Sequence, residues 1–229
     1  MTLDAAKPTE CDVFFDFETL SSNARYKLLV STIVPRPIAW IVTLDRDGRP
    51  NTAPFSFFNA FATDPPVVGI GIGSYDSGRP KDTRRNIQDT GQFVINLVSE
   101  ELAQAMNVTA IGFEPHVNEL AEAGLDTLPS VYVKPPRIAG APVAMECELM
   151  QIVELGKDTG LVLGRVLAMH VREVGVIDRA RHYIDIRKLN LIGRMHASWY
   201  ARTSNLFPMD RIPLADWPNR KSAHTTNNF

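Results

Sequence analysis

The apolar segments between residues 38 and 174 have the length of strands, and tight turns separate several of them. Residues 38–44 are apolar on both faces, and an Asp-Gly turn at residues 45–48 leads into residues 51–57, which predicts a hairpin. Residues 143–152 and 161–174 predict a second hairpin. Because strands and helices do not alternate regularly, the sequence predicts a mainly β protein: a small antiparallel barrel with peripheral helices.

A glycine repeat marks another strand, at residues 67–73. Side chains alternate along a strand, so Gly69, Gly71 and Gly73 share one face and leave it as bare backbone. Glycine weakens the interior of a strand, which indicates that another group approaches this face closely. A neighbouring helix or strand is the simpler occupant, and a bound ligand is the alternative.

Helix signals flank the predicted strands. Residues 24–33 have the apolar spacing of a short helix that the following prolines would end, and residues 81–90 predict a helix that Gly91 stops. Ser99 is placed to cap a helix that runs to about residue 110, and another short helix is expected near residues 117–123.

The strand that begins at Val143 alternates regularly. One face carries Val143 and Cys147, and the other carries Glu146 and Glu148. This alternation predicts a long antiparallel strand with one buried face and one face in water.

Length and charge bound the possible classes of protein. A chain of 229 residues can form one sizeable domain, which we assign to residues 21–218, after an N-terminal arm (1–20) and before a polar tail (219–229). A net charge of −2 provides no basic field for nucleic acid or anionic membranes. No apolar run is long enough to span a membrane, so neither nucleic acid nor a membrane is an expected partner.

The two cysteines, Cys11 and Cys147, are too few for a disulfide framework and lie in no zinc-binding motif. A reducing cytoplasm is therefore the expected location. Neither a metal site nor a hydrolase site is expected, because the chain lacks a Gly-x-Ser-x-Gly elbow and a Cys/His pair. A Rossmann nicotinamide fingerprint is also missing, and the five histidines are scattered.

Four cations lie within seven residues at the start of the predicted helix 81–90: Arg79, Lys81, Arg84 and Arg85. Unpaired N–H groups at a helix start also favour anions, so the segment predicts a phosphate site. Asp82 suits the first turn of the helix, and the Thr83 hydroxyl can donate to a phosphate oxygen. The alternative is a solvated cationic helix face.

A second group of candidate residues lies where a strand runs into a loop: Ser56, Phe57, Phe58 and Asn59. They combine aromatic surface with hydroxyl and amide groups that can bond the edge of a ring, although adjacent phenylalanines also serve as core packing. Trp40 is expected in the core. Arg36, held between two prolines, suits a guanidinium fixed near an anion or an ordinary surface arginine.

The order of six short motifs resembles the flavin reductase-like, FMN-binding split-barrel family, especially its flavoredoxin-like branch. The motifs are Pro35-Arg-Pro-Ile-Ala-Trp40, Asn51-x-Ala-Pro-Phe-Ser-Phe-Phe-Asn59, Asp64-Pro-Pro66, Lys81-Asp-Thr-x-x-Asn86, Phe93-Val-Ile-Asn96 and Gly164-Arg-Val166. The match spans residues 26–203. It implies a Greek-key-like split β-barrel, a homodimer, and FMN bound near the subunit interface.

The resemblance also implies roles for individual residues. Ser56, Phe57, Phe58 and Asn59 would face the ring and ribityl chain, Lys81, Asp82 and Thr83 the phosphate, and Tyr200 the flavin. NADH or NADPH would donate a hydride to the flavin, and electrons would pass to oxygen, a partner oxygenase or another redox protein.

The chain departs from the family at two places. Short flavin reductases often carry Gly-Asp-His before the last long strand, where this chain has Thr159 in place of the histidine. Related chains tend to have Gly-Gly where this one has His196 and Ala197. These departures leave two hypotheses, an NAD(P)H-dependent flavin oxidoreductase and a non-enzymatic FMN electron carrier that another protein reduces.

Overall fold

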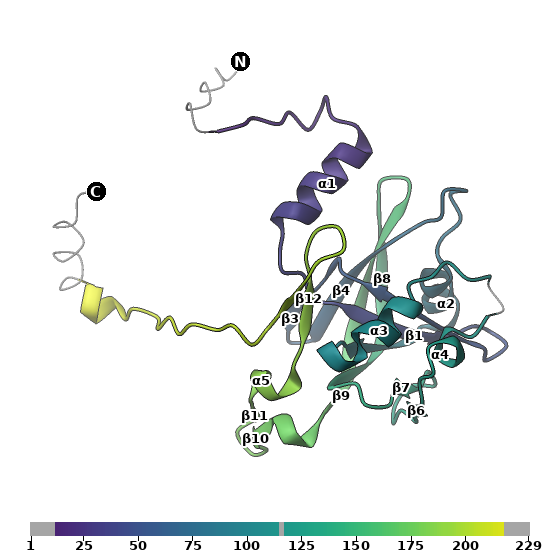
Figure 1. Ribbon diagram of the computed structural model, residues 1–229. Coiled ribbons are helices and arrows are strands. Elements are labelled where there is room, and N and C mark those ends of the chain that lie inside the picture. The colour runs from purple at the N-terminus through teal and green to yellow at the C-terminus, as the bar shows by residue number, and fades with distance from the viewer. Residues whose placement is uncertain (1–11, 115–116, 218–229) are drawn as a thin grey trace.

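The computed structural model describes residues 12–114 and 117–217 (Figure 1). The predicted polar tail, two histidines (His116 and His224) and Cys11 lie outside the described residues. Residues 12–19 of the predicted N-terminal arm are exposed.

Seven strands form one antiparallel sheet in the spatial order β2-β1-β5-β8-β9-β4-β3. The two outermost strands, β2 and β3, follow each other in the chain and are joined by only Ser56 and Phe57. The sheet must therefore curl so that its two ends meet, which makes a split barrel and confirms the predicted fold class. The strands are β1 (Ala39–Leu44), β2 (Pro50–Phe55), β3 (Phe58–Thr63), β4 (Pro66–Gly73), β5 (Gln92–Leu97), β8 (Val143–Leu155) and β9 (Thr159–Val171).

Shorter elements surround the barrel (Figure 1). The three small strand pairs are β6 (Thr127–Leu128) with β7 (Arg137–Ile138), β10 (Val176–Asp178) with β11 (Tyr183–Ile184), and β12 (Ile192–Arg194) with β13 (Tyr200–Arg202). The α-helices are α1 (Ser22–Thr32), α2 (Asp82–Thr90), α3 (Ala103–Val108), α4 (Glu119–Glu122) and α5 (Ile186–Leu189). Short 3₁₀ turns cover Glu100–Leu102, Glu173–Gly175 and Leu214–Asp216.

The core has two layers because β1 and β5 are covered on both faces. Ile41 and Ile95 belong to the cluster inside the barrel, whereas Trp40 and Val42 belong to a second cluster with Met106 of α3. Trp40 is fully buried, and its indole Nε1 donates to Thr109 Oγ1 at 2.9 Å, which confirms its predicted place in the core.

Phenylalanine side chains cover much of the glycine face of β4. A Cβ added to Gly69 would lie 2.6 Å from the Phe61 ring, and one added to Gly71 would lie 3.1 Å from Phe57 Cβ. At Gly73 the nearest such atom is the Asp158 carbonyl, at 3.8 Å. The simpler interpretation, a neighbouring strand packed close to the glycines, is confirmed at the first two positions.

Helices α1 and α2 form where the sequence predicts them. Ser21 Oγ accepts from Ala24 N and caps α1, which has Val30 as its one buried residue and projects from the barrel in Figure 1. Gly91 ends α2 in a left-handed conformation (φ 72°), as expected of a helix-stopping glycine.

The helix predicted from Ser99 to about residue 110 is wrong in part. A 3₁₀ turn, Glu100–Leu102, precedes α3, and the Ser99 side chain makes no capping bond. Ser99, two residues after β5, is bridged instead to Leu191, the residue before β12, and this pairing fixes its position.

The prediction of a solvated face on β8 is wrong at Glu146, which is fully buried. The loop before β7 covers it: the carboxylate accepts from Val131 N at 2.9 Å, from Tyr132 N at 2.6 Å and from His170 Nε2 at 2.7 Å. Burial raises the pKa of Glu146, but these donors outweigh it and hold the pKa below its usual value. The alternation of residues along a strand does not distinguish a buried, hydrogen-bonded glutamate from an exposed one.

Candidate functional site

Two adjoining cavities run along β2. One, of about 130 Å³, is lined by residues that include Asn51, Lys81 and Thr83, and we name it the cationic end. The other, of about 250 Å³, is lined by residues that include Tyr26, Ser56, Met106, Asn107, Arg194 and Tyr200, and we name it the aromatic end. Both cavities share Pro54, Phe55 and Ala110, so they form one groove.

The cationic end forms at the start of α2. Lys81 is the residue before the helix, it is half-buried, and its Nζ lies 5.9 Å from the centroid of the Phe55 ring. Thr83 is 2% exposed, and its Oγ1 accepts from Asn51 Nδ2 at 2.9 Å. The Asn51 bond uses an oxygen lone pair, so the Thr83 hydroxyl hydrogen remains available to an acceptor. A cation, a hydroxyl and helix N–H groups together suit an anion.

Asp82 binds the cations on either side of it. Its Oδ1 accepts from Arg79 Nη1 at 2.9 Å and pairs with Arg85 Nη2 at 2.7 Å, while Oδ2 accepts from Tyr75 Oη at 2.8 Å. Burial and this bond raise the pKa of Tyr75. Asp82 therefore lies in the first turn of α2, as the sequence predicted, and there it holds two arginines.

Arg84 does not contribute to the anion site. Its buried guanidinium pairs with Glu154 and packs against Gly160, on the β8–β9 side of α2. Of the four predicted cations, Lys81 alone has no carboxylate partner within residues 12–114 and 117–217. The predicted cluster of four cations thus reduces to one free ammonium.

The aromatic end is built by segments far apart in the chain. Tyr26 comes from α1, Ser56 from the β2–β3 link and Tyr200 from β13. The Arg194 guanidinium lies 4.7 Å from the centroid of the Tyr200 ring and donates to the Tyr200 hydroxyl. Sequence reasoning predicted Ser56 and Tyr200 but missed Arg194, whose only signal is its β12 position opposite Tyr200.

Phe57, Phe58 and Asn59 lie outside this groove. They line a separate cavity of about 250 Å³ beneath the end of α1, to which Ser56 also contributes. Phe58 packs on the barrel core, Phe57 is 44% exposed, and Asn59 Oδ1 accepts from Ala60 N. Their contact with a cofactor stays a prediction, and within one chain Ser56 is the member of this group that faces the groove.

Arg36 is buried and holds backbone carbonyl groups. Nη1 donates to Val30 O at 2.7 Å and Ile33 O at 2.8 Å, and Nη2 donates to Met195 O at 2.8 Å. The bond from Nε to Ser56 Oγ is longer, at 3.4 Å. Arg36 therefore ties the end of α1 to the β12–β13 loop beside the aromatic end, and it is not a surface arginine. Its contact with an anion stays a prediction, since the carbonyl groups already take most of its donors.

The positions of the two departures from the family differ. Thr159 begins β9 and pairs with Gly73, at the hairpin tip near the loop that holds Tyr75. His196 is exposed in the β12–β13 loop, where its carbonyl accepts from Trp199 N. Its neighbour Ala197 has φ 47°, a left-handed conformation that favours glycine.

Phe55, Pro54 and the 110–114 loop complete the groove and were not predicted as site residues. Asn51, Ala53 and Phe55 share one side of β2, so strand alternation could have found them. The loop carries no comparable periodic signal.

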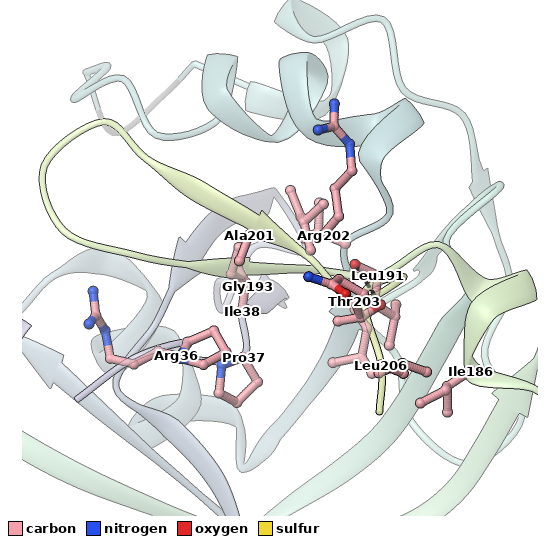
Figure 2. Close-up of a pocket in the computed structure, with 15 residues that line it drawn as sticks. Arg36, Pro37, Ile38, Ile186, Leu191, Gly193, Ala201, Arg202, Thr203 and Leu206 are labelled. Atoms are coloured by element: carbon pink, nitrogen blue, oxygen red, sulfur yellow. Dashed lines mark hydrogen bonds between the residues drawn. The ribbon is translucent and has the colours of Figure 1, made fainter. Parts of the chain in front are cut away.

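A larger cavity of about 370 Å³ lies between β12, β13 and the segment just before β1, which includes Arg36, Pro37 and Ile38 (Figure 2). Its lining includes Ile38, Leu191 and Leu206. The two arginines that line it already have protein partners: Arg36 donates to backbone carbonyl groups and Arg202 pairs with Glu100. This apolar cavity does not suit a phosphate.

The described residues contain no cluster of His, Cys, Asp and Glu that could hold a metal ion. None of their helices is long and apolar enough to cross a membrane. Cys147 is buried, and burial raises the pKa of its thiol well above the usual value, which makes it unreactive.

The family model of the flavin reductase like domain matches residues 30–186, which include all seven strands of the barrel sheet. The chain belongs to this family. An uncharacterized protein of Deinococcus radiodurans is 39% identical to this family member over 214 residues, which are 91% of this chain and 94% of the relative. The predicted resemblance is confirmed.

Solved structures of the family superpose on the barrel. Nitrilotriacetate monooxygenase component B from Bacillus cereus has a TM-score of 0.83 at 29% identity and covers 88% of this chain and 100% of its own. The 2-nitrobenzoate 2-nitroreductase NbaA of Pseudomonas fluorescens has a TM-score of 0.80 at 32% identity, covering 88% and 97%. The flavoredoxin of Desulfovibrio vulgaris (Miyazaki F), at 22% identity and a TM-score of 0.66 over 76% and 90%, shows the shared fold.

The groove fits a flavin mononucleotide on the chemistry of its donors. Its cationic end offers Lys81 and Thr83 to a phosphate, and its aromatic end offers Tyr200 and Ser56 to a ring system. The apolar Pro54 and Phe55 lie between them.

Proposed function

We propose that the groove binds FMN, with the phosphate at the cationic end and the ring at the aromatic end. The observation that carries this proposal is the meeting of the free Lys81 ammonium and the Thr83 hydroxyl at the start of α2, in a groove whose other end holds Tyr200. Asp82 also lines the cationic end, and its ion pairs with Arg79 and Arg85 offset the charge that it would otherwise oppose to the phosphate.

A bound flavin would supply hydride acceptance and electron transfer. The chain then needs to bind, orient and shield it. Arg194 holds the Tyr200 ring in place through its hydroxyl, and Arg36 fixes the loop that joins their two strands. No general acid or base is required of the protein.

The proposed reaction is hydride transfer from NADH or NADPH to flavin, followed by passage of electrons to oxygen or to a partner oxygenase or redox protein. Similarity to a structure named as a monooxygenase component supports a route to a partner protein. A chain with two cysteines, too few for a disulfide framework, favours a cytoplasmic location.

We propose a homodimer as the working form. Phe57 in the β2–β3 link is 44% exposed, Phe61 of the outer strand β3 is 62% exposed, and Ile33, just after α1, is 58% exposed. Ile33 and Phe57 line one cavity, and Phe57 and Phe61 pack on neighbouring glycines of β4. Exposed apolar side chains in these positions suit an interaction site. A second copy on this face would cover these side chains and would bring the cavity of Phe57 and Asn59 into contact with the bound flavin.

The second candidate is a non-enzymatic FMN carrier. The observation that favours it is Thr159, because short flavin reductases often carry a histidine there near the nicotinamide site. Such a carrier would bind FMN without oxidising nicotinamides.

The absorbance spectrum of the freshly purified protein, followed by titration with NADH and NADPH, tests both candidates. The enzyme requires a flavin spectrum or tight uptake of added FMN, and nicotinamide oxidation faster than with FMN alone. Stoichiometric FMN without faster oxidation would support the carrier. Absence of flavin binding would overturn both, and Lys81→Ala is the control that separates specific from adventitious flavin.

A further inference from the structure

Glu119 of α4 lines the cationic end together with Lys81 and Thr83. A carboxylate is an unexpected neighbour for a phosphate, because two anions repel each other. Burial, with a smaller contribution from the charge of Asp82, raises the pKa of the Glu119 carboxyl, although N–H groups of the backbone oppose this. The charge state of Glu119 is therefore sensitive to its surroundings.

Glu119 already has a structural partner, which does not need its charge. Thr52 N, on the side of β2 that faces away from β1, donates to Glu119 Oε2 at 3.0 Å. Alternate residues of a strand direct their N–H groups to the same edge, and Pro50 and Pro54, two residues away on either side, have none. The Thr52 N–H is therefore the one donor on this stretch of the edge that needs an acceptor. One acceptor oxygen satisfies it, and a protonated acid or an amide provides such an oxygen.

The other charged groups of the cationic end could not balance both a phosphate and an ionised Glu119. Lys81 is free, Asp82 is held by Arg79 and Arg85, and Tyr75 donates to Asp82. Glu114, in the segment between α3 and α4, adds another carboxyl to the lining. A phosphate monoester brings about −1.5 to −2 charges near neutral pH.

We propose that Glu119 is a proton-dependent specificity residue, whose protonated carboxyl accompanies the bound phosphate and donates to one of its oxygens. The inference rests on the proposed function. Binding of a phosphate-bearing flavin then takes up a proton on Glu119, so it weakens as the pH rises. A flavin without phosphate does not meet this carboxyl and has no such dependence.

The direction follows from the proton balance. At a pH low enough to protonate Glu119 in both the free and the bound protein, its neutral carboxyl does not repel the phosphate. Above its pKa in the free protein, binding must either take up a proton or place two anions together, and the dissociation constant for FMN rises. Glutamine at this position removes that dependence while it keeps the acceptor for Thr52.

The test compares the dissociation constants of FMN and riboflavin for the wild type, Glu119→Gln and Glu122→Gln, by quenching of flavin fluorescence. Glu122 is the matched control, because it is an exposed acid on the same short helix. We expect Glu119→Gln to bind FMN about tenfold more tightly than the wild type at about pH 8.5, the effect of roughly one pKa unit, and the two dissociation constants to converge as the pH falls. Riboflavin should show no difference, and Glu122→Gln should follow the wild type.

Calorimetry of the wild type in two buffers of different ionisation enthalpy gives a second measurement that does not depend on the variant's folding. We expect net proton uptake on binding FMN over the pH range in which the FMN affinity falls, and none on binding riboflavin. Parallel FMN curves for the wild type and Glu119→Gln, an equal change for riboflavin, or no proton uptake would overturn the inference alone. Failure of the wild type to bind either flavin would overturn the proposed function, and this inference with it.

Discussion

The two ends of the groove are built in different ways. At the cationic end, Asp82 and Thr83 are 7% and 2% exposed, and both are held by side chains of neighbouring elements. At the aromatic end, Tyr26 is 57% exposed, and the walls come from α1, α3 and the β12–β13 hairpin. One end is therefore fixed by the fold before a ligand arrives, whereas the other depends on a few tertiary contacts such as those of Arg36.

The largest expected effect is at the cationic end. Lys81→Ala should weaken FMN binding by about 1–3 kcal/mol, because a charge-assisted hydrogen bond to the phosphate is lost. Riboflavin binding should be unchanged, which isothermal titration of both ligands can measure. Lys188→Ala, an exposed lysine of α5 with the same change of charge, is the control. An equal loss for both flavins would contradict the assignment of this end to phosphate.

The next effect is at the aromatic end. Arg36→Gln removes the donors that reach Val30, Ile33 and Met195, so the free energy of unfolding should fall by about 1–2 kcal/mol. Urea unfolding measures this change. FMN and riboflavin should lose affinity equally, because the walls around the ring loosen and the cationic end does not.

The control for that variant is Arg202→Gln, which breaks an exposed ion pair with Glu100 and should cost no more than about 0.5 kcal/mol. A loss of FMN affinity in Arg36→Gln without a matching loss for riboflavin would mean that Arg36 contacts the phosphate. The difference between the two ends would then disappear.

The smallest effect concerns the loop beside Tyr200. Ala197→Gly should stabilise the protein by about 0.5 kcal/mol, because Ala197 has a positive φ that glycine adopts without steric cost. His196→Gly is the matched control, since residue 196 has no positive φ and should lose stability on substitution. Thermal unfolding of the two variants checks the prediction, and a gain at both positions would argue against relief of backbone strain at Ala197.

Local signals predicted the elements well. The Asp-Gly turn after β1, the glycine face of β4 and Gly91 after α2 each depend on backbone conformation, which the residue type determines directly. The resemblance of six ordered motifs extended these local predictions to the fold.

Partners of charged side chains were harder to predict. Glu146 looked solvated because the strand's alternation does not show that the loop 14 residues earlier folds back over it. Arg84 looked like an anion ligand because Glu154 lies 70 residues later. Arg36 faces carbonyl groups of α1 and of residue 195, which no local pattern indicates. Lys81 and Thr83 could be assigned from sequence because the helix start that positions them is local.

The link between β2 and β3 has a consequence for how this chain can change in length. Ser56 and Phe57 connect the two outer strands, and Phe57 O accepts from Gly71 N at 2.7 Å. Because side chains alternate along a strand, one inserted residue here would turn Phe58 outward and Asn59 into the core. Insertions should therefore be tolerated in pairs or elsewhere, such as at the β8–β9 hairpin tip, and the spacing from Phe55 to Phe58 should resist length variation more than any loop of the barrel.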